Sequence, residues 1–245
     1  IGIAPFSACT QLTEINVDEA NPYFSSLDGV LTDKNRTTIV AYPAGKGKRY
    51  IIPDGITKIG THSFFACPIT YIHTPNSVKT IELFAFASCT DLDTIILGNS
   101  VDSIEGAAFR INDRLKTIYS MNPIPPAAHP EAFSSFSPMF FIQCTLYVPV
   151  GSLQAYKNAE VWKNFKNIVE NDFTGIERPS PDKAKIFGNK NSISFRNIEP
   201  GTDISIYDTT GKCIKTFAVD GDSEIPLPSG IYLIKYAGRT VKIIL

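Results

Sequence analysis

The sequence predicts a mainly β protein in which a solenoid of short stacked coils precedes a small antiparallel β-sandwich. Three observations predict this order. Apolar residues recur at a fixed spacing through the first part of the chain. A polar segment with Pro179 and Pro181 then ends the pattern. From residue 185 onward, short runs alternate apolar and polar residues between Gly-containing turns, which is typical of paired antiparallel strands.

The repeat has a period of 22 or 23 residues, and it ends in Leu-x-x-Ile-x-hydrophobic. Such a period with this ending is typical of a leucine-rich-repeat solenoid. One coil cannot bury its own apolar residues, but stacked coils place identical positions on top of one another. The recurring anchors are Ile59, Ile81 and Ile104, then Phe64, Phe86 and Phe109, then Ile72, Ile95 and Ile118.

The first residues repeat the same order of anchors, and an insertion follows them. The anchors of this first copy are Ile1, Phe6, Cys9, Leu12 and Ile15. Within the insertion, "DGVL" and "TTIVAYP" predict two strands joined by a polar turn at Thr32–Arg36. "RYIIP" predicts a third strand before the period resumes.

The end of the solenoid is predicted from three further segments. "NPIPPAAHPEAF" is too rich in proline for a helix and brings Phe133 into the Phe position of the repeat. "CTLYVP" is expected to form the last strand of the solenoid. In 151–165, Ser152 is a candidate N-cap, and Trp162 and Phe165 follow at helical spacing. We expect a helical cap there, because an uncovered last coil would expose apolar surface.

These segments divide the chain into a capped solenoid at 1–172, a linker at 173–184 and a β-sandwich at 185–245. The net charge is −1, and no part carries the basic field expected of a nucleic-acid-binding protein. No apolar run reaches the roughly 18 residues that span a bilayer. No signal peptide is visible, and the sequence starts inside a repeat. The oligomeric state is not set by the sequence, and a monomer is the working expectation.

Three of the five cysteines share one repeat position. Cys9, Cys67 and Cys89 occupy it, and Asn112 fills it in the next copy. A position that accepts Cys or Asn at a turn indicates a small group that bonds to the backbone. A disulfide between Cys67 and Cys89 is the alternative, although ladder geometry rarely matches disulfide torsions. The other two cysteines, Cys144 and Cys213, are isolated in predicted strands.

Two stretches carry a resemblance to known families. "VKTIELFAFASCTDLDTIIL" resembles the BspA-type leucine-rich repeats of Bacteroidetes surface proteins, and the likeness extends over about residues 1–170. "ISIYDTTGKCIKTF" with "LPSGIYLIKY" is similar to the C-terminal sorting domains of type IX secretion cargo. The resemblance implies a secreted or outer-surface protein that adheres to proteins or glycans.

Residues for catalysis or for metal and cofactor binding are not indicated. His62 lies five residues before Cys67, and a Cys–His pair is the arrangement of a nucleophile with its base. No orienting acid or oxyanion donor accompanies them, and Cys67 occupies a structural repeat position. No spacing of His and Cys fits zinc. We therefore predict no enzyme activity, no cofactor and no metal site.

The candidate binding site is a row of outward-facing strand residues. Because strand side chains alternate, the residue before the last position of each Leu-x-x-Ile-x-hydrophobic strand should point away from the core. Tyrosine is enriched in interfaces, although strand propensity alone also favours such residues. This position and the neighbouring outward one contain Asn16, Ala41, Ile51, His73, Ile96, Tyr119 and Tyr147, and Glu14, Tyr71, Thr94 and Thr117. The strongest candidates are Tyr71, His73, Ile96, Tyr119 and Tyr147.

The sequence therefore predicts a non-enzymatic binding or adhesion protein that presents a strand face to an extracellular protein or glycan. A structural spacer or anchor is the alternative. A hydrolase with a site in the inserted hairpin ranks third, and it would require a deep pocket with converging acids or histidines.

Overall fold

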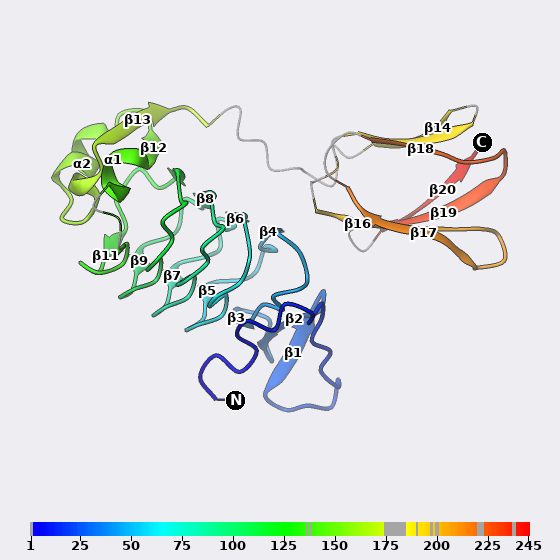
Figure 1. The fold of residues 1–245 in the computed structure, drawn as a ribbon, viewed down its shortest axis with the longest axis horizontal. Coiled ribbons are helices and arrows are strands. Elements are labelled where there is room, and N and C mark those ends of the chain that lie inside the picture. Colours follow the sequence, from blue (N-terminus) through cyan, green and yellow to red (C-terminus); the bar gives the residue numbers. More distant parts are fainter. Residues whose placement is uncertain are drawn as a thin grey trace. The chain divides into compact units, whose positions relative to one another are not determined.

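The computed structural model describes residues 2–135, 137, 139–173, 185–189, 191–196, 198, 201–219, 223–236 and 239–245. The chain forms two compact units, Ile1–Phe173 and Thr174–Leu245, which are described separately (Figure 1). The first is a β-solenoid, and the second contains two antiparallel sheets. The predicted fold class is thereby confirmed. Apart from Phe173, the predicted linker at 173–184 lies outside the described residues.

Two sheets run along the solenoid. The seven-stranded sheet has the order β1-β2-β3-β5-β7-β9-β11, and the six-stranded sheet has the order β13-β12-β10-β8-β6-β4. The strands of the first sheet are β1 (Phe24–Leu27), β2 (Val30–Asp33), β3 (Thr38–Ala41), β5 (Lys58–Ile59), β7 (Thr80–Ile81), β9 (Ser103–Ile104) and β11 (Ala127–Ala128). Those of the second are β4 (Arg49–Ile51), β6 (Tyr71–His73), β8 (Thr94–Leu97), β10 (Thr117–Ser120), β12 (Thr145–Pro149) and β13 (Asn167–Asn171).

The parallel register follows the sequence period. In the seven-stranded sheet, Ile59 pairs with Ile81 and Ile81 pairs with Ile104. In the six-stranded sheet, Ile72 pairs with Ile95 and Ile95 with Ile118. All six isoleucines are at most 2% exposed. Burying one such side chain stabilises a fold by roughly 1.5–3 kcal/mol, so every coil gains from the neighbour that covers it.

A column of stacked aromatic rings, the phenylalanine column, fills the centre of the solenoid. Ring centroids are 4.8 Å apart for Phe64–Phe86, 5.3 Å for Phe86–Phe109 and 5.1 Å for Phe109–Phe133. Each of these rings is at most 1% exposed. Tyr42, 22 residues before Phe64, stacks on it at 4.9 Å. The predicted Phe ladder is confirmed, and Tyr42 extends it by a position that the sequence analysis did not assign.

The position shared by cysteines and Asn112 donates a hydrogen bond to the coil before it. Cys89 Sγ lies 3.0 Å from the carbonyl oxygen of Phe64, and Asn112 Nδ2 lies 3.0 Å from that of Phe86. Cys67 makes the same contact to Tyr42 at 3.8 Å. All three cysteines of this position are free, so the disulfide alternative is wrong. The interpretation as a group that bonds to the turn backbone is confirmed for the two buried cysteines, whereas Cys9 is exposed.

The N-terminal segment keeps the turn of the repeat without its strands. Three successive repeat turns have two residues with positive φ, four positions apart: His62 and Ala66, Phe84 and Ser88, and Ala107 and Ile111. Ala4 and Ala8 show the same pair, but no strand is assigned among described residues 2–23. The predicted strands at "DGVL" and "TTIVAYP" correspond to β2 and β3. They pair antiparallel, and β1, which was not predicted, pairs with β2.

The last coil is covered by α1 (Phe140–Gln143), α2 (Leu153–Asn158) and the 3₁₀ turn η1 (Trp162–Asn164). Trp162 Nε1 donates to the carbonyl oxygen of Pro126 at 2.8 Å, which anchors the predicted cap. Ser152 precedes α2, but its side chain makes no capping bond. Glu170 Oε1 instead accepts from the backbone N–H groups of Gly151 and Leu153.

β13 corrects the expectation that "CTLYVP" forms the last strand of the solenoid. It pairs in parallel with β12 and continues the six-stranded sheet by one strand. The prediction is wrong because the cap helices do not end the repeat. Ile168 follows Leu146 by the repeat spacing of 22 residues, so the period does continue through the cap.

The second unit packs a three-stranded sheet, β14-β15-β18, and a four-stranded sheet, β17-β16-β19-β20, around a separate core. Alternate residues of β19 are buried, including Tyr232 and Ile234, which is the period-two pattern read from the sequence. The strands are β14 (Lys185–Asn189), β15 (Ser192–Arg196), β16 (Asp203–Tyr207), β17 (Cys213–Ala218), β18 (Ser223–Pro226), β19 (Ile231–Tyr236) and β20 (Arg239–Ile244).

Candidate binding face

Two columns of side chains lie on the face of the six-stranded sheet that points away from the core. Parallel pairing sets the members of each column. The tyrosine column contains Ile51, His73, Ile96, Tyr119, Tyr147 and Val169. The threonine column contains Arg49, Tyr71, Thr94, Thr117, Thr145 and Asn167. Neighbouring strands lie about 4.8 Å apart, so both columns hold side chains at a regular spacing.

The candidate residues differ in exposure. His73 and Ile96 are only 1% and 3% exposed, so the expectation that they contribute exposed surface is wrong. Each lies between the same-position side chains of two adjacent strands, which cover its flanks. Tyr71, Tyr119 and Tyr147 are half-buried and accessible.

Three members of the predicted row do not belong to this sheet. Ala41 lies in β3 of the seven-stranded sheet and is 4% exposed. Glu14 and Asn16 lie in no assigned strand. Ile51 already keeps the 22-residue spacing to His73, so this coil has its strand of the six-stranded sheet at residues 49–51, and Ala41 is a second assignment to the same coil that the spacing does not support.

Tyr119 and Tyr147 form a stacked pair at the C-terminal half of the face. Their ring centroids lie 4.8 Å apart with an interplanar angle of 15°. Phe173, which follows β13, meets Tyr119 edge-on at 6.4 Å. Val169, the next residue of the column, is 44% exposed. We call Tyr119, Tyr147, Val169 and Phe173 the tyrosine patch.

Ionised groups are sparse on this face. The tyrosine and threonine columns contain no Asp or Glu, and the Arg49 guanidinium lies 4.0 Å from the ring centre of Tyr71. Glu170, on the neighbouring position of β13, is engaged with the backbone of the cap. Burial raises the pKa of Tyr119, and the neighbouring Tyr147 raises it further. The Tyr119 hydroxyl therefore stays protonated at neutral pH.

The Cys67 and His62 pair lacks the properties of a nucleophile and its base. Burial raises the pKa of the Cys67 thiol to about 12, which excludes a thiolate at neutral pH. His62 stacks on Phe84 at 5.0 Å, and desolvation lowers its pKa. No group of metal-binding side chains occurs among the residues that the structure describes.

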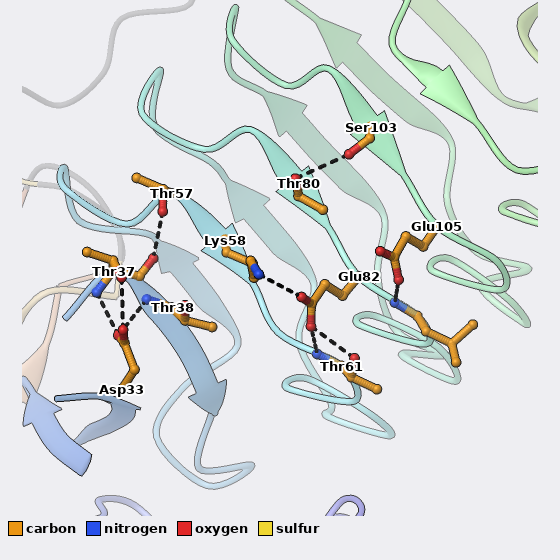
Figure 2. Close-up of polar contacts among 11 residues, drawn as sticks. Asp33, Thr37, Thr38, Thr57, Lys58, Thr61, Thr80, Glu82, Ser103 and Glu105 are labelled. Atoms are coloured by element: carbon orange, nitrogen blue, oxygen red, sulfur yellow. Dashed lines mark hydrogen bonds and ion pairs between the residues drawn. The ribbon is translucent and has the colours of Figure 1, made fainter. Parts of the chain in front are cut away.

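The polar side chains of the seven-stranded sheet bind one another or the backbone of neighbouring coils (Figure 2). Glu82 pairs with Lys58 at 3.1 Å and accepts two hydrogen bonds from Thr61 in the preceding coil. Glu105 repeats this by accepting from the backbone N–H of Leu83. Both carboxylates lie at equivalent repeat positions, so these contacts link successive coils.

Sequence reasoning missed Arg49, Val169 and Phe173 on the face. Two of them could have been found by spacing, because Arg49 precedes Tyr71 by 22 residues and Val169 follows Tyr147 by 22. Phe173 lies beyond the repeat, and nothing in its sequence context indicates that it contacts Tyr119.

Comparison with known proteins agrees with this fold. Residues 43–146 match the family model of the BspA type leucine rich repeat region in six copies. This part of the chain is therefore similar to BspA-type leucine-rich repeats. A search of curated proteins finds no match.

Solved structures of bacterial leucine-rich-repeat proteins are also similar. The pneumococcal vaccine antigen PcpA has 19% identity and a TM-score of 0.42, with 65% of this chain and 50% of that chain covered. A leucine rich cell surface protein from Faecalibacterium prausnitzii has 20% identity and a TM-score of 0.39, with 70% and 45% covered. The chain thus spans about half the length of these two proteins. Within the described residues, no helix has the length and apolar character needed to cross a membrane.

Proposed function

We propose that this chain is a non-enzymatic binding protein of the cell surface or the secreted fraction. Its six-stranded face contacts an extracellular protein or glycan, and the resemblance to BspA-type proteins supports an adhesive role. The observation that carries the proposal is the stacked, half-buried pair Tyr119–Tyr147 in the C-terminal half of a sheet face whose columns contain no carboxylates. Rigid coils hold both rings in place, so little conformational entropy is lost on binding.

The test is a binding screen with a paired variant. Wild-type protein is applied to an array of extracellular-matrix proteins and to a glycan array. Tyr119→Ser/Tyr147→Ser should abolish binding to whatever the wild type retains, because aromatic anchors at an interface each contribute on the order of 2 kcal/mol. Tyr23→Ser is the matched control, since Tyr23 is 74% exposed and lies outside both columns. A folded double variant with unchanged binding would move the site elsewhere.

A structural spacer is the second candidate function. The predicted second domain supports it, because a sandwich behind a solenoid can serve for export, anchoring or distance. The same arrays separate the two functions, because a spacer should bind to neither array. Deletion of a spacer should impair the surface presentation of another protein, whereas deletion of an adhesion protein should impair adhesion. Localising the chain by antibody labelling of intact and permeabilised cells tests the proposed surface location.

We also propose that the solenoid and the sandwich fold independently, with the linker at 173–184 between them. Their cores contain different residues, which supports this division. Limited proteolysis should cut between about Asp172 and Lys183 and leave two folded fragments. A disordered NMR spectrum for isolated residues 185–245 would show that the division is wrong.

A further inference from the structure

The orientation of the aromatic rings restricts the kind of partner that the tyrosine patch can bind. Tyr119 and Tyr147 stack on each other, which hides one face of each ring. The opposite face of Tyr119 is turned toward its β8 neighbour Ile96, and that of Tyr147 toward its β13 neighbour Val169. The accessible parts of this pair are therefore the ring edges and the hydroxyl groups.

The third aromatic ring of the face is covered in a similar way. The Arg49 guanidinium lies over the ring of Tyr71, 4.0 Å from its centre. Stacking of a sugar ring or a planar ligand requires an open aromatic face, and each of these three rings already has a face covered by a neighbouring side chain. The arrangement disfavours recognition by stacking.

The exposed ring edges and hydroxyls favour electron-rich partners. The edge of an aromatic ring carries partial positive charge, and a protonated tyrosine hydroxyl is a hydrogen-bond donor. No hydrogen bond of the Tyr119 or Tyr147 hydroxyl is found within the described part of the chain. Stacked rings hold these two donors close together, on strands about 4.8 Å apart.

The absence of carboxylates from the two columns favours the same kind of partner. No carboxylate lies in either column, and Glu170 is engaged by the backbone of the cap. Asp93, at the edge of the face, is neutralised by Lys116 at 3.5 Å. Lys166, exposed directly before β13, is three residues from Val169 in the sequence, and Asp172, also exposed, directly precedes Phe173. Within the two columns, a partner carboxylate would therefore meet the two hydroxyl donors and no carboxylate.

We infer that the tyrosine patch binds an acidic peptide segment, whose carboxylate and carbonyl oxygens accept hydrogen bonds from the hydroxyls of Tyr119 and Tyr147. This inference rests on the proposed binding function and names the partner class for the same site. Val169 and Phe173 supply apolar contact beside the hydroxyls. An extended segment of a partner protein presents acceptors and apolar side chains together, as this patch requires.

The test uses the full chain on an array of short acidic peptides, their amide counterparts with Asn and Gln in place of Asp and Glu, and a panel of neutral glycans. Wild-type protein should retain acidic peptides in preference to both other sets. Tyr119→Phe/Tyr147→Phe keeps the rings and removes only the hydroxyls. It should weaken binding to the retained acidic peptides about tenfold or more, because each lost hydrogen bond is worth about 1 kcal/mol.

The Phe and Ser pairs separate failure of this inference from failure of the proposed function. If wild type and Tyr119→Phe/Tyr147→Phe bind acidic peptides equally well, the proposed hydrogen bonds from the two hydroxyls are overturned. Preference for glycans, kept by the Phe pair and lost by the Ser pair, would overturn the acidic partner while leaving the binding face in place. The inference is also overturned if wild-type protein binds no acidic peptide more strongly than the matching Asn/Gln peptide. Thermal melting of both variants controls for loss of fold.

Discussion

Two columns of aromatic rings illustrate what the repeat does inside and outside the solenoid. The phenylalanine column and the Tyr119–Tyr147 pair both stack at 4.8 to 5.3 Å, because the coils impose the same spacing on each. The Phe rings are at most 1% exposed, whereas the Tyr rings are half-buried. Identical spacing therefore stabilises the fold where the rings are enclosed and presents a surface where they are open.

Truncation of a ring in the buried column should have the largest effect on stability. Phe86→Ala leaves a cavity between Phe64 and Phe109, and such changes cost roughly 3–5 kcal/mol. Urea unfolding followed by the fluorescence of Trp162 reports on the solenoid, because this is the single tryptophan and it lies in the cap. A midpoint close to the wild-type value would contradict the structural role of the column.

Loss of the hydrogen bond from Asn112 to the Phe86 carbonyl oxygen should have the next largest effect on stability. Asn112→Ala leaves the Phe86 carbonyl oxygen without its side-chain donor, which costs about 1–3 kcal/mol for a buried group. Asn112→Cys is the matched control, because Cys89 fills the equivalent position and bonds to Phe64. Equal losses in both variants would show that the Asn side chain acts by packing rather than by donation.

The contacts between coils on the seven-stranded sheet should depend on pH. Burial alone would raise the pKa of Glu82, but hydrogen bonds from Lys58 and Thr61 outweigh it and lower the pKa. A lowered folded-state pKa stabilises the fold above the unfolded value of about 4.3, and this contribution disappears as the pH falls through the folded pKa. Glu82→Gln should flatten the decline of the solenoid's urea midpoint in this acidic range. An unchanged pH profile would exclude Glu82 as a contributor.

Relief of backbone strain in the turns should have the smallest effect. Ser88 has a φ of 60°, which disfavours residues with a Cβ by about 1 kcal/mol. Ser88→Gly should therefore raise stability by up to about 1 kcal/mol, partly offset by the entropy of glycine. The neighbouring Ala87, outside the positive-φ region, is the control, and Ala87→Gly should lower stability. Losses of equal size at both positions would argue against strain in the turn.

The buried positions could be predicted from sequence more fully than the exposed ones, for a physical reason. Ile72, Ile95 and Ile118 must match because each covers the next, so their spacing is visible in the chain. No comparable constraint acts on outward positions, so residues as different as His73 and Tyr119 occupy equivalent positions of the repeat. Burial of His73 depends on the size of its neighbours and on the path of the sheet, which spacing alone does not define.

Length changes between repeats account for the remaining errors. The inserted hairpin obscured Tyr42, and the cap obscured β13, although both keep the 22-residue spacing to a neighbouring coil. Phe173 meets Tyr119 from a local turn after β13, in which its N–H donates to Asn171 Oδ1 and its φ is 55°. That contact is a tertiary feature without a repeat signal.

The most direct test of the contrast between the two columns is the free energy of unfolding of Tyr119→Ser/Tyr147→Ser, measured in urea by Trp162 fluorescence. Both rings are half-buried on the outer face, so the solenoid should lose far less stability than the roughly 3–5 kcal/mol expected for Phe86→Ala. A loss equal to that of Phe86→Ala, or failure to fold, would contradict the account, because the outer tyrosines would then be core residues rather than a surface for recognition.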